Sequence, residues 1–270
     1  MLGSKRAVQF LGRVLQLFHR DFGGAGKPPL VVIHGLLGSS RNWQTVGAEL
    51  STQRHVLALD LRNHGVSPHA ADHDFATMEA DVLRWLDAQK IERAAVMGHS
   101  MGGKVAMALA CHHPGRVERL VSVDIAPRDY DAEKFRGILE AMLAIVPERL
   151  ASRAEAETQL AAVVKDWAMI KFLTTNLERG GDGRFQWRVN VPALHAELDE
   201  IARTSLSPGD RYEGPTLFVV GGYSRHVREE DRPEILARFP QARIETVAES
   251  GHNPHIEQRE AFVAAVRGFL

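Results

Sequence analysis

One serine lies in a sequence context that could make it a nucleophile. Ser100 is the central residue of the segment Gly98–Gly102, whose sequence is Gly-His-Ser-Met-Gly. The apolar residues 94–97 before it predict a short strand, and the apolar run 105–110 after it predicts a helix. Because glycine has no side chain, the outer glycines allow a strand to turn sharply into a helix and expose the serine hydroxyl. The Met101 N–H would then lie at a helix N-terminus, where it could bind an oxyanion.

A serine hydroxyl becomes a good nucleophile only when a base removes its proton, so the chain should also supply a base. The chain has 13 histidines, and a histidine by itself is therefore weak evidence. His252 differs by its place, because it follows the last predicted strand, residues 242–248. In a parallel sheet, the loops that carry Ser100 and His252 would leave the strands at the same edge. We therefore predict that His252 is the base; the alternative is a structural histidine.

These motifs resemble those of a known family. The segment 98–104 resembles the nucleophile elbow of α/β-hydrolases, and is especially similar to that of the small bacterial carboxylesterases of the YbfF type. Segments 34–38 (His-Gly-Leu-Leu-Gly) and 60–67 (Asp-Leu-Arg-Asn-His-Gly-Val-Ser) are similar to further loops of the family. The resemblance implies the α/β-hydrolase fold, with a mostly parallel eight-stranded sheet flanked by helices. It also implies that the Leu36 N–H is the second oxyanion donor. The implied substrates are short-chain carboxylic esters, with acyl thioesters as an alternative.

The acid of the expected triad is harder to assign. Most members of the resembled family place an aspartate after the next-to-last strand, in a Gly-x-x-Asp pattern. The corresponding segment here is Gly221–Ser224, so a serine stands at the position of the aspartate. Some α/β-hydrolases use the end of the strand after the nucleophile, where this chain has Asp124 in the Asp-Ile-Ala-Pro segment found in YbfF-type esterases. We therefore predict a triad of Ser100, Asp124 and His252; the alternatives for the acid are Glu229, Glu230 and Asp231.

The regular alternation of strands and helices stops after residue 127. Residues 128–205 have apolar residues at helical spacing, and their sequence predicts no further sheet. We expect an α/β core made of residues 1–127 and 206–270, with residues 128–205 inserted as a helical lid. At the other end, residues 8–22 predict one or two opening strands at a sheet edge. The side chains that we expect around the substrate pocket are Leu37, His34, His99 and Trp187.

Composition narrows the possible partners. The 270 residues are 44% hydrophobic and 25% charged, and the net charge of −1 does not favour nucleic acid as a partner. Arg6, Arg13 and Arg20 interrupt the N-terminal apolar residues, so we predict no signal peptide, no membrane insertion and a cytoplasmic location. No motif predicts a metal or an organic cofactor. We expect a monomer or homodimer that acts on a small-molecule ester.

The alternatives to a serine carboxylesterase share its scaffold. A lactonase or a carbon–carbon bond hydrolase would use the same triad. A non-catalytic ligand-binding protein would keep the fold but lack a complete triad. The serine at position 224 is the observation that favours this last alternative, because a triad without an acid would bind a ligand without cleaving it.

Overall fold

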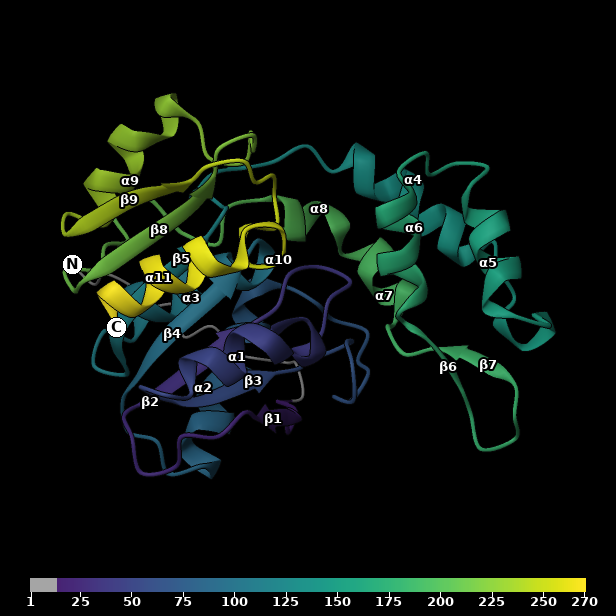
Figure 1. Ribbon diagram of the computed structural model, residues 1–270, viewed down its shortest axis with the longest axis horizontal. Coiled ribbons are helices and arrows are strands. Elements are labelled where there is room, and N and C mark those ends of the chain that lie inside the picture. Colours follow the sequence, from purple (N-terminus) through teal and green to yellow (C-terminus); the bar gives the residue numbers. More distant parts are fainter. Residues whose placement is uncertain (1–13) are drawn as a thin grey trace, which may run out of the picture.

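A seven-stranded sheet forms the centre of the molecule (Figure 1). The computed structural model describes residues 14–270. The edge strand β1 pairs antiparallel with β3, and the other strand pairs described in this sheet are parallel. From edge to edge the strands are β1 (His19–Asp21), β3 (His55–Leu59), β2 (Pro29–Ile33), β4 (Ala94–His99), β5 (Val117–Val123), β8 (Thr216–Gly221) and β9 (Ala242–Val247).

The central strands are apolar because both faces of the sheet are covered. Along β2, Val31 and Ile33 belong to the core on one face, and Leu30 and Val32 belong to the core on the other. The first face packs against α2 (Phe75–Ala88), α3 (Met101–His112) and α9 (Arg232–Arg238). The second face packs against α1 (Gln44–Leu50) and α11 (Arg259–Phe269). Shorter helices are η1 (Ser40–Trp43), η3 (Glu229–Asp231) and α10 (Pro254–Glu257).

The predicted fold is correct, and within the described residues the main sheet has one strand fewer than expected. We expected eight strands in the main sheet, and seven are found there within residues 14–270. Of the opening region 8–22, residues 8–13 lie outside the described part of the chain, and the remainder contributes β1 alone. Among the described residues, no helix combines the length and the apolar character that a membrane span requires.

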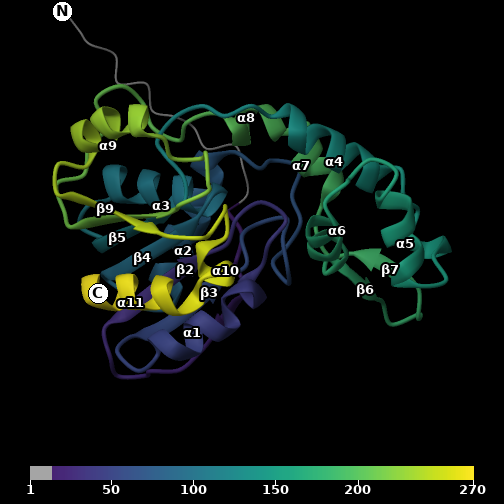
Figure 2. The same cartoon turned by 45° about the horizontal axis from the view of Figure 1, so that its top comes forward.

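The chain between β5 and β8 lies beside the sheet rather than on one of its faces (Figures 1 and 2). Its elements are mainly helical, as expected. They are α4 (Glu133–Leu143), η2 (Pro147–Arg149), α5 (Arg153–Leu160), α6 (Trp167–Thr174), α7 (Val191–Ala196) and α8 (Leu198–Ala202). The expectation that this segment has no sheet is wrong, because β6 (Leu177–Arg179) and β7 (Phe185–Trp187) form a two-stranded antiparallel sheet. Each strand has three residues, which is too short to show a period of two in the sequence.

A buried lysine connects this segment to the central sheet. The Lys104 side chain, on the first turns of α3, donates hydrogen bonds to the backbone carbonyls of Ile201, Ala202 and Arg203 at 3.3, 2.9 and 2.5 Å. These carbonyls end α8, where unpaired acceptors favour a cation. Burial lowers the pKa of Lys104 to about 7. The end of α8 is therefore held against the helix that begins at Met101.

Candidate active site

Ser100 lies at the turn between β4 and α3, as predicted. Its backbone has φ +52° and ψ −119°, a conformation that residues with side chains rarely adopt. The turn depends on the glycines beside it. A Cβ on Gly98 would lie 2.0 Å from the carbonyl oxygen of Gly102, and a Cβ on Gly102 would lie 2.4 Å from that of His34. No other residue fits at either position without a backbone shift.

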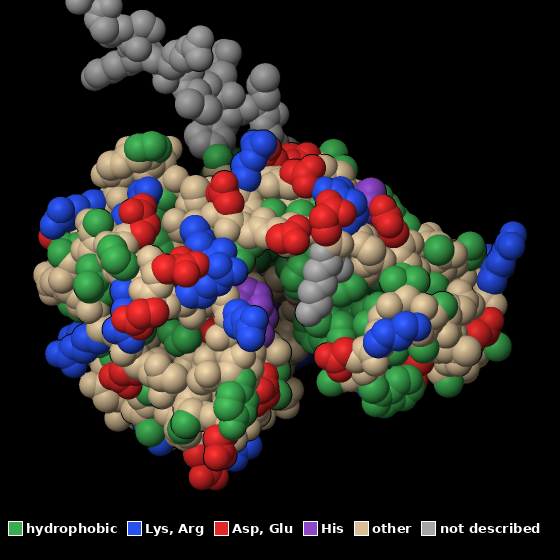
Figure 3. All heavy atoms as spheres, turned by 90° about the horizontal axis from the view of Figure 1, so that it is seen from above, with side chains coloured by type: hydrophobic (Ala, Val, Ile, Leu, Met, Phe, Trp, Pro, Cys, Tyr) green, Lys and Arg blue, Asp and Glu red, His purple; other side chains and the backbone are tan. Residues whose placement is uncertain are grey.

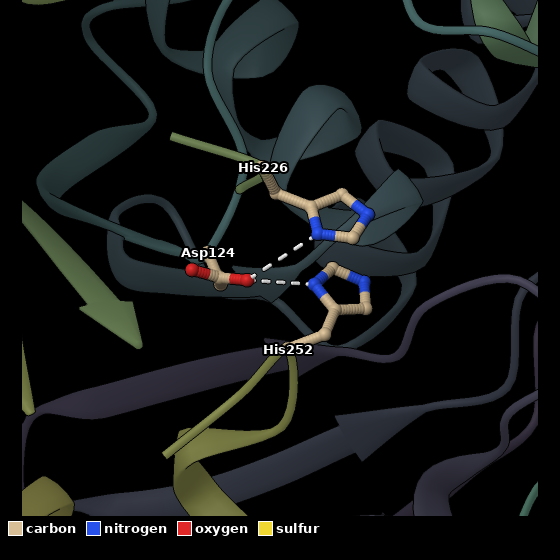
Figure 4. A group of neighbouring side chains, drawn as sticks. All are labelled: Asp124, His226 and His252. Atoms are coloured by element: carbon tan, nitrogen blue, oxygen red, sulfur yellow. Dashed lines mark hydrogen bonds and ion pairs between the residues drawn. The ribbon is translucent and has the colours of Figure 1, made fainter. Parts of the chain in front are cut away.

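Asp124 and His252 meet at the edge of the sheet, although 128 residues separate them in the chain. Asp124 directly follows β5 and is completely buried. Its Oδ2 lies 2.7 Å from His252 Nδ1, within the range of a charge-assisted hydrogen bond (Figure 4). Its Oδ1 accepts a hydrogen bond of 3.0 Å from the Gly221 N–H. Burial raises the pKa of Asp124, and its hydrogen-bond donors oppose that rise.

Ser224, which occupies the position of the usual family acid, contacts the same carboxylate. Its hydroxyl donates to Asp124 Oδ2 at 2.5 Å. The carboxylate that contacts His252 thus comes from the end of β5, and a hydroxyl donor stands after β8, the position of the usual family acid. The loop that carries Ser224 still takes part in the arrangement, because it stabilises the ionised carboxylate.

The other three acidic candidates do not join this group. Glu229 pairs with Arg232 at 2.7 Å, Glu230 pairs with Arg228 at 2.8 Å, and both are largely exposed. Asp231 pairs with Arg128 at 3.0 Å. Each of these three carboxylates therefore has an arginine as its ion-pair partner.

Two further histidines lie against the His252 ring. The His226 ring stacks on it with a centroid distance of 3.6 Å and an interplanar angle of 18°. The His99 ring lies 4.6 Å away at an angle of 46°. Burial lowers the pKa of His99 well below its usual value, so its ring is neutral. His99 Nε2 lies 2.8 Å from the His252 carbonyl oxygen and therefore donates its proton to it.

Asp124, His226 and His252 are also a possible set of metal ligands. One ligand atom from each lies within 4.8 Å of the others (Figure 4). Imidazole and carboxylate ligands suit a transition metal. However, the stacked rings are nearly parallel, so their Nδ1 atoms point in similar directions instead of converging on one ion. The geometry fits hydrogen bonds to a shared carboxylate oxygen better than it fits a metal site.

The two predicted oxyanion donors are available. Within the described chain, the backbone N–H groups of Leu36 and Met101 donate no hydrogen bond to another protein atom. The loop before Leu36 is held by His34, whose Nδ1 lies 2.8 Å from the Gly35 carbonyl oxygen and whose Nε2 accepts from the Leu61 N–H at 3.0 Å. Leu36 lines the cavity at Ser100, and Met101 directly follows Ser100 in the chain.

A cavity of about 540 Å³ opens at Ser100. Its core wall includes Ser100, His252 and three residues that we predicted or considered for the site: His34, Leu36 and His99. Its opposite wall consists of Phe135 from α4 and of Asp166, Ala168, Met169 and Phe172 from the region of α6. Figure 3 shows a hollow between the two parts of the molecule, with histidine visible in it and hydrophobic side chains along the side of the β5–β8 segment.

Two predicted pocket residues do not line this cavity. Leu37 has φ +63° and is buried in the core, where its N–H donates to His64 Nε2. The left-handed backbone turns its side chain away from the cavity. Trp187 belongs to β7, outside the lining. The lining residues of α4 and α6 were missed, because their spacing shows only that they lie on an apolar helix face.

Comparisons with known proteins identify the family. The family model described as "alpha/beta hydrolase fold" matches residues 28–258. The chain belongs to the α/β-hydrolase family. It is 41% identical to the sn-1-specific diacylglycerol lipase ABHD11 of Mus musculus, over 92% of this chain and 82% of that one. It is 35% identical to esterase YbfF of Escherichia coli K12, over 90% of this chain and 92% of that one.

A solved structure gives the same result for the three-dimensional fold. A marine microorganism esterase aligns with a TM-score of 0.92 and 34% identity, covering 95% of this chain and all of that one. The resemblance to YbfF-type esterases is confirmed. These three relatives are 34–41% identical to the chain, and they are two esterases and a lipase. The chain is therefore a carboxylic ester hydrolase.

Proposed function

We propose that this protein is a serine carboxylesterase that hydrolyses short-chain carboxylic esters through an acyl-enzyme. Ser100 Oγ attacks the acyl carbon while His252 takes its proton. Asp124 holds the imidazole with Nδ1–H toward the carboxylate and offsets the positive charge that develops on the ring. The N–H groups of Leu36 and Met101 bind the oxyanion, and each is worth about 3 kcal/mol in the transition state. His252 then protonates the leaving alcohol, and water, activated by the same ring, releases the acid.

The observation that carries this proposal is the 2.7 Å contact between Asp124 and His252 beside a cavity that Ser100 also lines. It supplies the acid whose absence at position 224 would have favoured a non-catalytic binding protein. The chain order of Ser100, Asp124 and His252 is the order that this fold uses. A lactonase or carbon–carbon bond hydrolase would share the triad, and no contact in the cavity favours either one.

The cavity supports an acyl group that packs against apolar side chains. Its far wall comes from α4 and α6, so we further propose that residues 128–205 act as a lid over the α/β core of residues 1–127 and 206–270. In this arrangement the lid sets the acyl length that the site accepts. Acyl thioesters would fit the same chemistry, since the leaving thiol takes a proton from His252 as an alcohol does.

Ser100→Ala tests the proposal directly. We expect ester hydrolysis to fall by about 10⁴-fold or more, because the nucleophile is lost while the oxyanion donors remain. The measurement is turnover of p-nitrophenyl butyrate, together with labelling by a fluorophosphonate probe, which should react with the wild type and not with the variant. Ser51→Ala, a surface serine at the end of α1, is the control for loss of a hydroxyl. Near wild-type hydrolysis by Ser100→Ala would show that another group is the nucleophile.

A further inference from the structure

His226 is the strongest unassigned feature near the site. It lies two residues after Ser224, in the loop that follows β8. No sequence pattern separates it from most of the other histidines of the chain. Its ring covers one face of the His252 ring at a centroid distance of 3.6 Å, with the planes 18° apart. The centroid distance is that of two rings in van der Waals contact. Figure 4 shows both rings directed toward the Asp124 carboxylate.

The polar atoms of His226 belong to the same network as those of His252. Its Nδ1 lies 3.3 Å from Ser224 Oγ and 3.7 Å from Asp124 Oδ2. Its backbone N–H donates to Ser224 Oγ at 3.2 Å. The single proton of the Ser224 hydroxyl goes to Asp124, so the hydroxyl oxygen can accept from His226. His252, Ser224 and His226 thus all approach the same carboxylate oxygen, Asp124 Oδ2.

His226 is itself held in place by the start of the lid. Its carbonyl oxygen accepts from the Tyr130 hydroxyl at 2.6 Å and from Arg128 Nη2 at 3.4 Å. The Tyr130 ring also stacks on the His226 ring at 5.9 Å and 26°. Burial raises the pKa of Tyr130 to about 12, so the phenol stays protonated and remains a donor. The position of the His226 ring is therefore set by contacts that do not involve His252.

The His252 ring needs such support. It sits on a loop after β9, and its side chain is 24% exposed. The hydrogen bond to Asp124 positions its Nδ1, and the contacts with the faces of the ring position the ring plane. His99 meets one side of the ring at a steep angle and holds the His252 backbone, while His226 lies flat on it. General base catalysis requires the ring nitrogen to stay aligned with the serine hydroxyl.

We propose that His226 is a positioning residue, which holds the catalytic imidazole in its productive orientation by stacking on its face. The proposal rests on the proposed function, because it assigns His252 as the base. We assign most of this orienting effect on the His252 ring to the stacked aromatic face of His226, and not to its Nδ1 atom.

Three variants separate the ring from its nitrogen. His226→Phe keeps an aromatic face and loses Nδ1. His226→Asn keeps a nitrogen near the Nδ1 position and loses the ring. His226→Ala loses both. We expect the alanine and asparagine variants to lower kcat for p-nitrophenyl butyrate by about 10-fold or more with KM changed less than about twofold, since a misaligned base slows chemistry without weakening binding. His226→Phe should restore kcat to within about threefold of wild type.

The control is Arg225→Ala, on the same loop between Ser224 and His226. The Arg225 side chain is exposed and makes no ion pair among residues 14–270, so its loss should leave kcat unchanged. A second readout is the proton resonance of the His252 Nδ1–H, which reports the hydrogen bond to Asp124. We expect this low-field signal to persist in wild type and His226→Phe and to broaden or disappear in His226→Ala. Thermal melting of each variant checks that the fold is retained.

Three results would overturn the proposal. Wild-type kcat in His226→Ala would show that His252 needs no stacking partner. Equal loss in the phenylalanine and alanine variants, with rescue by asparagine, would show that Nδ1 and not the ring matters. An unchanged Nδ1–H signal in His226→Ala would show that the ring does not hold the imidazole. The proposed function fails separately, if the wild type itself does not hydrolyse esters or if Ser100→Ala remains active.

Discussion

At the scale of single residues, the proposed triad acid lies at the end of a different strand from the one that most members of the family use. Asp124 reaches His252 from the end of β5, while Ser224, after β8, donates to the carboxylate instead of supplying one. Asp124 also has a left-handed backbone, with φ +52°. Such a conformation is costly for a residue with a side chain, and it persists here because the Gly221 N–H and the Ser224 hydroxyl hold the carboxylate.

Asp124→Asn should therefore lower kcat by about 10⁴-fold, because the amide cannot offset the imidazolium charge and favours the wrong tautomer of His252. Steady-state kinetics with p-nitrophenyl butyrate provide the measurement. Glu229→Ala and Glu230→Ala are matched controls, since both carboxylates are exposed and pair with arginines away from His252. We expect these controls to stay within about twofold of wild type. An active Asp124→Asn enzyme would mean that the acid lies elsewhere.

Sequence patterns predicted the convergence of Ser100, Asp124 and His252 because each lies just after a strand of one parallel sheet. The strand-end rule gives the edge at which such residues meet. It does not give the direction of a side chain within a loop. Leu37 is the example, because its positive φ sends the side chain into the core instead of the cavity. His226 could not be singled out, because its contact with His252 depends on the path of the loop after Ser224.

At the scale of elements, the buried strands and their helices were predictable from apolar runs that glycine and proline interrupt. The short elements were not. The β6–β7 hairpin contains three residues in each strand, and its apolar residues Leu177 and Phe185 are buried in a hydrophobic cluster that extends beyond the hairpin. We infer that this burial contributes more to the hairpin than local strand preference does, because strand preference depends on packing context. The same limit applies to α6, whose apolar face is divided between the core and the cavity.

Met169→Trp tests the place of α6 in acyl selection. Met169 is partly buried and lines the cavity opposite Ser100, so a larger ring there should shorten the space available to the acyl chain. On p-nitrophenyl esters of graded chain length, we expect kcat/KM for octanoate to fall by about 10-fold or more relative to acetate. Thr175→Trp, exposed at the end of the same helix, is the control. An unchanged chain-length profile in Met169→Trp would exclude this wall from the acyl site.

At the scale of the whole molecule, several buried histidines with lowered pKa values make the stability of the fold depend on pH. Burial lowers the pKa of five of them: His34, His64, His73, His99 and His255. For His73 the pKa falls to about 3. The unfolded chain takes up protons at these residues near pH 6.5, whereas the folded protein does not. More protons bound in the unfolded state means that stability falls as the pH drops from 6.5 toward 3.

We expect the free energy of unfolding to decrease between pH 7 and pH 5, with His73 alone contributing about 2 kcal/mol of that decrease. Urea denaturation at both pH values measures it. His73→Phe, which fills the same space without a titratable ring, should show a smaller loss by about that amount. A wild-type stability that is flat from pH 7 to pH 5, or an equal loss in His73→Phe, would contradict the assignment of this ring as neutral.

The Lys104 contact has a consequence for how a substrate reaches the cavity. Lys104, which donates to the last carbonyls of α8, lies three residues after Met101, so the first turn of α3 carries both the contact with α8 and a proposed oxyanion donor. A motion that displaced α8 would break the three hydrogen bonds that Lys104 donates to its last carbonyls. We therefore expect α8 to stay in place and the proposed lid to open at the opposite margin, where α4 and α6 would move away from the sheet.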